Sequence, residues 1–177
     1  MLKMLPENNV LRVSRTKAQA KQVYDRINRL HDFFAGFFEE KYRNRALELL
    51  EVKEGETVLE IGFGTGHCLK KLAEQVGGEG RVFGIDISSG MVEISKKRLE
   101  KAGLLDRVEL CCGDATELPY KANKFDAVFM SFTLELFDTP ELPQVLGEIR
   151  RVLKPNGKLG VVSKSKENGD SILLKLY

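Results

Sequence analysis

The stretch Val58-Leu59-Glu60-Ile61-Gly62-Phe63-Gly64-Thr65-Gly66 decides the fold. Its apolar half closes a segment, residues 56–61, that we expect to form a buried β-strand. A helix is expected directly afterwards, from His67 to Val76. The three glycines between them let the backbone turn sharply and let a ligand approach closely, because glycine has no Cβ. The stretch therefore indicates a strand–loop–helix binding unit.

The main competing interpretation is the dinucleotide-binding pattern Gly-x-Gly-x-x-Gly. The third glycine of that pattern would fall at position 67, which is His67, whereas Gly66 comes one residue early. Glu60, two residues before the first glycine, also suits a different ligand. An NAD-dependent dehydrogenase is therefore a disfavoured alternative.

Outward from this stretch, strands and helices alternate. Further strands are expected at residues 81–85, 107–111, 125–130 and 158–163, and helices from Ser88 or Ser89 to Lys101 and over residues 140–153, with a turn at residues 155–157. Strands separated by helices predict an α/β fold with a doubly wound, mainly parallel sheet.

The segment before the predicted sheet has a different sequence pattern. Residues 17–50 carry apolar side chains at helical spacing, and we expect them to form two helices, with Gly36 loosening or bending the helix around it. We therefore divide the chain into an N-terminal arm with lid helices, residues 1–50, and a binding domain, residues 51–177.

Acidic side chains follow the second and third strands. Asp86 closes the second, where a carboxylate can accept two hydrogen bonds from a ribose diol, although it could also serve as a helix cap. Asp114, in Gly113-Asp114-Ala115, can accept from an adenine amino group or simply form a turn. The fourth strand runs into Ser131 and Phe132 at the expected topological switch point.

These four motifs, in this order, resemble the class I S-adenosylmethionine-dependent methyltransferases over about residues 17–163. The resemblance implies S-adenosyl-L-methionine as the cofactor and a Rossmann-like sheet of strand order 3-2-1-4-5. The family's sheet normally has seven strands. We expect the last two to be absent here and residues 171–177 to begin a helix. Strand five would then have a bare edge, from which we expect dimers or aggregates.

The resemblance also implies a set of cofactor-binding residues. The glycine loop would lie under the methionine part, Glu60 near its amino group, Asp86 at the ribose and Asp114 at the adenine. Met91 and Phe132 could equally be core residues. The full set is Tyr24, Glu60, Gly62, Phe63, Gly64, Thr65, Gly66, Asp86, Ile87, Met91, Asp114, Ala115, Met130, Ser131 and Phe132.

The sequence after the fourth strand bears on the methyl acceptor. It reads Ser131-Phe132-Thr133-Leu134, whereas enzymes that methylate exocyclic base amines typically carry Asn-Pro-Pro-Tyr there. The apolar run of residues 129–137 suits a hydrophobic small molecule, with Glu135 as the candidate substrate contact. No catalytic residue is assigned, and His67 is interpreted as a helix residue rather than a base.

The segment from Val23 to Asn28 is similar to the start of the ubiquinone and menaquinone biosynthesis C-methyltransferases. The similarity implies a quinone precursor as acceptor and a lid in which Tyr24 covers the cofactor. The alternative for Tyr24 is an amphipathic helix that packs it on the core. Two other functions stay open: a catalytically weak or inactive cofactor-binding module, and an RNA methyltransferase, which the ten basic against five acidic residues in residues 1–45 would favour.

Composition narrows the class of protein. With 177 residues, 42% hydrophobic and 31% charged, and a net charge of +2, the chain is typical of one globular domain. It contains no apolar run for a membrane span or signal peptide. Cys68, Cys111 and Cys112 lack the spacing of a metal site and predict reduced thiols in a cytoplasmic protein. We expect a small-molecule acceptor, no metal and no nucleic-acid partner; peripheral membrane contact and a homodimer stay open.

Overall fold

The computed structural model describes residues 31–165 and 171–176, with the side chains of residues 39–163. The expected alternation of strands and helices is confirmed. The elements are α2 (His31–Leu50), β1 (Thr57–Ile61), α3 (His67–Gln75), β2 (Arg81–Asp86), α4 (Ser89–Ala102), η2 (Leu105–Arg107), β3 (Val108–Cys112), β4 (Phe125–Ser131), η3 (Leu134–Leu136), η4 (Thr139–Glu141), α5 (Leu142–Val152), β5 (Leu153–Ser165) and β6 (Ser171–Leu176).

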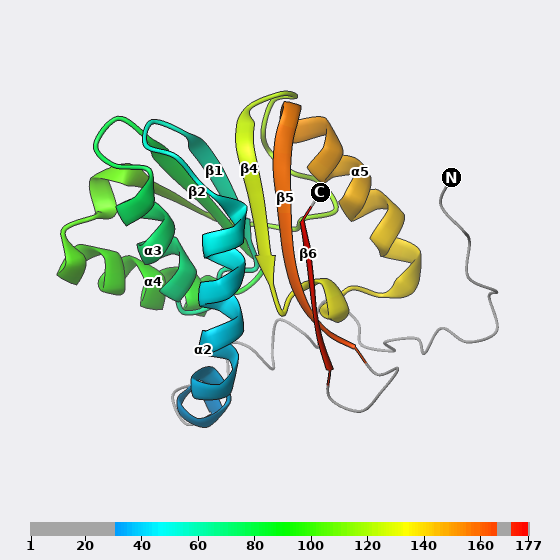
Figure 1. The fold of residues 1–177 in the computed structure, drawn as a ribbon, viewed down its shortest axis with the longest axis horizontal. Helices are drawn as coiled ribbons and strands as arrows, with labels where there is room; N and C mark the ends of the chain where they lie inside the picture. Colours follow the sequence, from blue (N-terminus) through cyan, green and yellow to red (C-terminus); the bar gives the residue numbers. More distant parts are fainter. Residues whose placement is uncertain (1–30, 166–170, 177) are drawn as a thin grey trace.

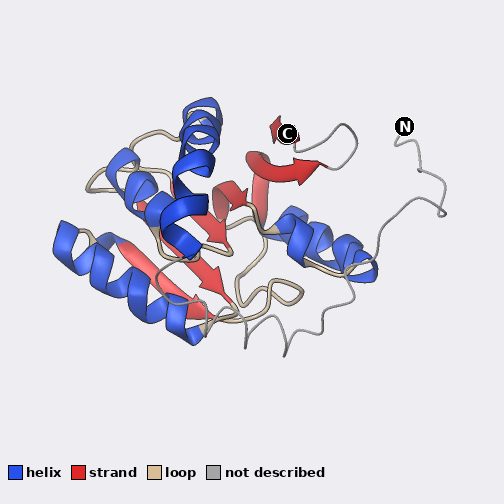
Figure 2. Ribbon diagram, turned by 90° about the horizontal axis from the view of Figure 1, so that it is seen from below, coloured by secondary structure: helices blue, strands red, loops and turns tan. Residues whose placement is uncertain are grey.

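The described strands form one sheet of order β3-β2-β1-β4-β5-β6. The first five are parallel to one another, as the sequence predicted, and β6 runs antiparallel to β5. Helices α3 and α4 lie on one side of the sheet and α5 on the other (Figures 1 and 2). The strand order reverses between β1 and β4, so the loops after these two strands meet at the carboxyl edge of the sheet.

Each face of the sheet has its own hydrophobic core. Ala46, Leu47 and Leu50 of α2 share the first core with α3 and α4, whereas α5 packs on the second. The central strands are therefore buried on both faces, which explains why they are near-continuous apolar runs in the sequence. Because the last turns of α2 belong to the first core, a boundary after residue 50 crosses that core; the division into two parts stays a prediction.

Helix α4 begins and ends as its sequence predicts. Ser88 is the N-cap, and its Oγ accepts a hydrogen bond from the backbone N–H of Met91 at 3.2 Å. Gly103 is the C-cap in the left-handed region, with φ of 66°. This capping fixes where α4 starts relative to Asp86, two residues before its N-cap.

The expectation of a helix at residues 171–177 is wrong. Residues Ser171–Leu176 form β6, which pairs with β5 from Gly160 to Ser165. A short apolar run does not distinguish a strand from a helix by periodicity, and the free backbone groups along β5 favour the strand. The edge of β5 is therefore paired with β6 from Gly160 to Ser165 and is not bare along this stretch. A bare edge was the reason for expecting dimers or aggregates, so that expectation loses its basis.

Helix α2 continues through Gly36 without a break; residues 17–30 lie outside the described part of the chain, so the expectation of two helices stays a prediction. The turn at residues 155–157 lies within β5 as a bulge: Phe125 pairs with Leu153 but Ala127 with Lys158, and Asn156 has φ of 66°. None of the described helices has the length and apolar character needed to cross a membrane.

Candidate functional site

The glycine loop between β1 and α3 is held by hydrogen bonds within the protein. Gly62, Gly64 and Gly66 have φ of 69°, 53° and 78°. Residues with a side chain rarely adopt this left-handed backbone conformation. The Gly62 N–H donates to the Ile85 carbonyl at 2.8 Å, and the Gly66 N–H donates to the Phe63 carbonyl at 3.0 Å. The predicted turn is therefore present, with a conformation that requires glycine.

Two polar side chains pack directly against this loop. A Cβ on Gly62 would lie 2.2 Å from Thr133 Cγ2, and one on Gly66 would lie 2.7 Å from Ser95 Oγ. The Thr133 hydroxyl lies within donating distance of two carbonyls, that of Gly62 at 3.2 Å and that of Ser131 at 3.0 Å, and Ser95 donates to the Gly64 carbonyl at 2.8 Å. In contrast, no atom lies within 4 Å of a Cβ built on Gly64. The loop is thus backed by protein at its two ends and open at its centre.

Asp86, at the carboxyl end of β2, binds the centre of the loop. Its Oδ2 accepts from the Gly64 N–H at 2.8 Å, and its Oδ1 accepts from the Ser88 N–H at 2.9 Å. A carboxylate has about four acceptor positions, and hydroxyl groups of a ribose are donors that it can bind. The structure therefore brings the predicted ribose-binding residue and the glycine loop together.

Glu60 is the most unusual side chain at this edge of the sheet. It is only 2% exposed, and its Oε2 has no hydrogen-bond partner among the described residues. Burial raises the pKa of this carboxyl well above its ordinary value; the nearby charge of Arg43 lowers the pKa, and that of Asp86 raises it. A buried carboxyl oxygen without a donor is costly for the fold, which marks Glu60 as a candidate ligand-binding group.

The third predicted motif lies beside Asp86. The Gly113 N–H donates to the Asp86 carbonyl at 2.9 Å, so the loop after β3 runs alongside the end of β2. Asp114 Oδ1 accepts from the Thr116 N–H at 2.9 Å, as in an Asx turn. Asp114 therefore has the turn-forming contact considered from the sequence, and its position also places it next to the candidate ribose site.

The end of β4 and the loop after it contribute the remaining predicted residues at this carboxyl edge of the sheet. Ser131 Oγ accepts from Arg43 Nε at 3.3 Å, and the Arg43 guanidinium carbon lies 5.4 Å from the centre of the Phe132 ring. Phe132 has φ of 53°, a strained conformation for a residue with a side chain. Its N–H donates to the Val162 carbonyl at 2.7 Å, and this bond to β5 helps to hold the strained residue in place.

The other predicted residues differ in burial. Four of them have side chains in the two cores: Phe63, Met91, Ala115 and Met130. Thr65 and Ile87 are half-buried. Glu135 accepts from the Ser163 hydroxyl at 2.9 Å, near the carboxyl ends of β4 and β5. Tyr24 lies outside the described residues. For all of these, contact with a ligand or a substrate stays a prediction.

Three residues at the site were not singled out from the sequence: Arg43, Ser95 and Thr133. Ser95 follows Met91 by four residues and so shares the buried face of α4, which is an unusual place for a serine and a usable signal. Arg43 carried no such signal, because its position depends on how α2 packs across β5 and α3.

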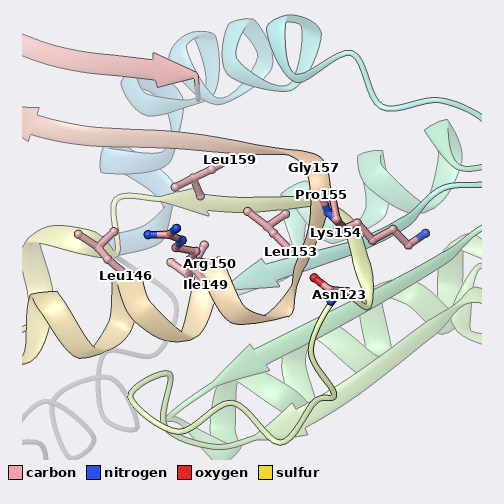
Figure 3. A pocket seen from close by; sticks show the side chains of 9 residues that line it. All are labelled: Asn123, Leu146, Ile149, Arg150, Leu153, Lys154, Pro155, Gly157 and Leu159. Atoms are coloured by element: carbon pink, nitrogen blue, oxygen red, sulfur yellow. The ribbon is translucent and has the colours of Figure 1, made fainter. Parts of the chain in front are cut away.

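A separate open groove of about 370 Å³ lies between α5 and the bulge of β5 (Figure 3). Leu146, Ile149 and Leu153 line it together with Lys154 and Leu159. Leu153 pairs with Phe125, the first residue of β4, so the groove lies toward the amino-terminal ends of the strands. It is thus at the opposite edge of the sheet from the glycine loop and does not belong to the candidate site.

The cysteines and other residue types that can bind metals give no evidence for a further function at this site. All three cysteines are free, and burial raises the pKa of Cys68 well above its ordinary value. Within the described ranges, no three His, Cys, Asp or Glu side chains gather in a way that could hold a metal ion.

Comparison with known proteins identifies the family. A family model described as a methyltransferase domain matches residues 58–157, which include the glycine loop, Asp86, Asp114 and the end of β4. The chain belongs to this family. The resemblance to S-adenosylmethionine-dependent methyltransferases drawn from the sequence is therefore confirmed.

Among curated members of the methyltransferase family, a demethylmenaquinone methyltransferase of Listeria welshimeri is 37% identical over 145 residues, which are 82% of this chain and 59% of that protein. One from Lactobacillus johnsonii is 36% identical over 151 residues, 85% of this chain and 60% of that protein. The chain thus spans about three fifths of the length of the curated relatives it matches.

Solved structures show the same fold. A SAM-dependent methyltransferase from Aquifex aeolicus is 35% identical with a TM-score of 0.64, over 73% of this chain and 67% of that chain. The [4+2]-cyclase SpnF is 29% identical with a TM-score of 0.75, over 88% of this chain and 64% of that chain. A fold of this kind is therefore found in proteins named for different reactions, so the reaction must be argued from the site.

Proposed function

We propose that this chain is the cofactor-binding part of an S-adenosylmethionine-dependent methyltransferase that methylates a hydrophobic small molecule of the quinone-precursor class. The observation that carries the proposal is the pairing of Asp86 with the open centre of the glycine loop, beside the buried, unpartnered Oε2 of Glu60. The names of the curated relatives support the acceptor class.

The residues fit this cofactor in their charges and hydrogen-bonding groups. S-adenosylmethionine carries a ribose diol, whose hydroxyl groups a carboxylate such as Asp86 can accept, and an ammonium group, for which Glu60 has an oxygen without a donor. An ammonium group beside Glu60 would favour the ionised carboxylate and so offset the burial that raises its pKa. The cofactor supplies an electrophilic methyl group on a sulfonium, which an acceptor displaces in line.

The contribution of the protein to such a displacement is mainly positioning. Thr133 and Ser95 pack against the glycine loop, and the hydrogen bond from the Phe132 N–H to the Val162 carbonyl holds the end of β4 beside it. Glu135, close to this end of β4, remains our candidate for contact with the acceptor. A lid formed by residues 1–50, with Tyr24 over the cofactor, and a cytoplasmic location are further parts of the proposal.

Asp86 provides the first test. Asp86→Ala is expected to weaken binding of S-adenosylhomocysteine at least tenfold, which is about 1.4 kcal/mol, in calorimetric titration. The loss should be smaller for the 2′-deoxy analogue, because that ligand lacks a hydroxyl that the carboxylate would accept. An equal loss for both ligands would show that Asp86 acts only through its bonds to the Gly64 and Ser88 backbone.

The acceptor class is tested with labelled methyl transfer. We expect transfer from S-adenosylmethionine to a reduced demethylmenaquinone-type naphthoquinol, measured as label in the organic extract. Label in RNA instead would favour the RNA methyltransferase alternative. Saturable cofactor binding without transfer to either acceptor would favour the inactive binding module, and would contradict the proposed reaction for this chain.

A further inference from the structure

The loop between β3 and β4, residues 113–124, contains no helix or strand and is held by side chains of α5. Glu148 Oε2 accepts from the Leu118 N–H at 2.8 Å, and Arg151 Nη2 donates to the carbonyl of Leu118 at 3.0 Å. Arg151 Nη1 also donates to the Tyr120 carbonyl at 2.7 Å. One pair of α5 side chains therefore binds both backbone groups of Leu118 and the carbonyl of Tyr120.

Glu148 and Arg151 also bind each other. Nε and Nη2 of Arg151 donate to the two different oxygens of Glu148, each at 2.7 Å, a two-point geometry that fixes both side chains. The hydrogen bonds from Arg151 hold the pKa of Glu148 below its ordinary value, against the effect of burial, so this carboxyl is ionised at neutral pH. The pair thus presents a fixed set of donors and acceptors to the loop.

A third side chain of α5 extends this contact. Gln144 Nε2 donates to the Thr116 carbonyl at 3.0 Å. Gln144, Glu148 and Arg151 are spaced four and three residues apart, so they lie on one face of the helix. One face of α5 therefore holds the loop from Thr116 to Tyr120.

The stretch that α5 holds begins two residues after Asp114, the predicted adenine ligand. The Thr116 N–H donates to Asp114 Oδ1 at 2.9 Å, and the Glu117 N–H donates to the Asp114 carbonyl at 3.2 Å. On the other side, the Gly113 N–H donates to the Asp86 carbonyl at 2.9 Å. Asp114 is thus fixed between the end of β2 and the held stretch. Because hydrogen bonds weaken steeply with distance and angle, the direction of its carboxylate depends on that stretch staying in place.

We propose that Glu148 and Arg151 are positioning residues that set the preference of the cofactor site for adenine, acting through Asp114. This inference rests on the proposed function. Both residues belong to α5, which lies on the side of the sheet opposite α3 and α4 (Figure 1). An adenine amino group donates to a carboxylate, whereas hypoxanthine presents a carbonyl oxygen there, which a carboxylate repels. The placement of Asp114 therefore controls discrimination between these two bases.

The test compares S-adenosylhomocysteine with S-inosylhomocysteine, which has a carbonyl oxygen in place of the adenine amino group. We expect the unmodified chain to bind S-adenosylhomocysteine roughly tenfold more tightly or better, as for one hydrogen bond to a charged group. Arg151→Gln removes the guanidinium that holds Leu118 and Tyr120. It should lower this affinity ratio about threefold or more, through weaker binding of S-adenosylhomocysteine. Calorimetric titration measures both affinities.

Two variants of the same helix act as controls. Arg150 is exposed and lines the separate groove between α5 and β5 (Figure 3), so Arg150→Gln should leave the ratio unchanged. Arg151→Lys keeps the positive charge but not the planar fork of donors, so the ratio should stay low. Full recovery by lysine would mean that charge and not position sets the preference, which overturns the inference. A folded but less stable Arg151→Gln chain that keeps the original ratio also overturns it, because the pair would then only support the fold.

A final comparison tests whether the effect passes through Asp114. In an Asp114→Asn background, where the ratio is already reduced, Arg151→Gln should lower it no further. An equal further loss would overturn the inference. If Asp114→Asn leaves the ratio unchanged, Asp114 is not the adenine ligand, and the inference fails while the proposed function stands. If the unmodified, folded chain binds neither ligand, the proposed function fails, and the inference fails with it.

Discussion

Replacing Gly62 by alanine is expected to lower the free energy of unfolding by about 3 kcal/mol or more. The residue would have to keep φ of 69°, which costs an L-residue roughly 1–2 kcal/mol. Its Cβ would also lie 2.2 Å from Thr133 Cγ2 and 2.8 Å from Thr133 Cβ, an overlap that the backbone or the β4 loop must relieve at a cost of about 1–3 kcal/mol. Urea denaturation followed by circular dichroism measures the loss.

The chain offers a matched control for this substitution. Gly64→Ala places alanine at a similar positive φ of 53°, but no atom lies within 4 Å of the new Cβ. It should therefore cost only the conformational part, roughly 1–2 kcal/mol. Thr133→Gly should recover part of the Gly62→Ala loss, since it removes all three clashing atoms. Equal losses at Gly62 and Gly64 would contradict the close packing of Thr133 on the loop.

Replacing Glu60 by glutamine is expected to weaken S-adenosylhomocysteine binding roughly 10- to 100-fold, or about 1.4–2.7 kcal/mol. Glutamine has almost the same shape and keeps one acceptor oxygen, so the loss reports the charge that we expect to face the ammonium group. Calorimetric titration near neutral pH measures it. Unchanged affinity would show that Glu60 is a buried structural residue and not a ligand for the cofactor.

The same variant has an opposite effect on the free protein. The pKa of Glu60 in the folded state is raised above the value of about 4.3 expected in the unfolded chain. Its contribution to stability is therefore fully present at pH values below about 4 and is lost as pH rises through the folded-state pKa. Glu60→Gln does not ionise, so its stability relative to the unmodified chain should increase as pH rises. A difference that does not depend on pH would contradict this assignment.

Glu60→Gln thus separates the demands of folding from those of binding. A buried carboxyl with an unpartnered oxygen and a raised pKa is unfavourable for the free protein, and a neutral side chain of equal size should be tolerated better. The carboxyl is useful only with a cation beside it. We therefore expect the variant to be more stable above neutral pH and a weaker binder, a combination that loss of a structural residue would not produce.

Much of the fold follows from local sequence signals. The positions of Ser88 and Gly103 set the ends of α4, and the run from Val58 to Ile61 ends at glycines that the structure holds in the left-handed region. Asp86 and the glycine loop could be assigned to one edge of the sheet because parallel strands end at the same side. These features depend on residues close together in the chain.

The features that the sequence did not predict depend on long-range packing. Residues 171–176 form a strand because β5 offers an edge, which no local periodicity records. Arg43 reaches Ser131, 88 residues away in sequence, because α2 packs across the sheet. Met130, expected at the wall of the site, is fully buried in the core on the side of α5, and its contact with the cofactor stays a prediction. Because both faces of this sheet are covered, the sequence of a central strand does not show which of the two cores a given side chain enters.

The measurement that tests the central claim most directly is calorimetric titration of the unmodified chain with S-adenosylhomocysteine. The arrangement of Glu60, the glycine loop and Asp86 predicts saturable binding at one site, with a dissociation constant in the micromolar range, about −8 kcal/mol. Absence of saturable binding, by a chain that circular dichroism and a cooperative urea transition show to be folded, would contradict the assignment of this edge of the sheet as a cofactor site.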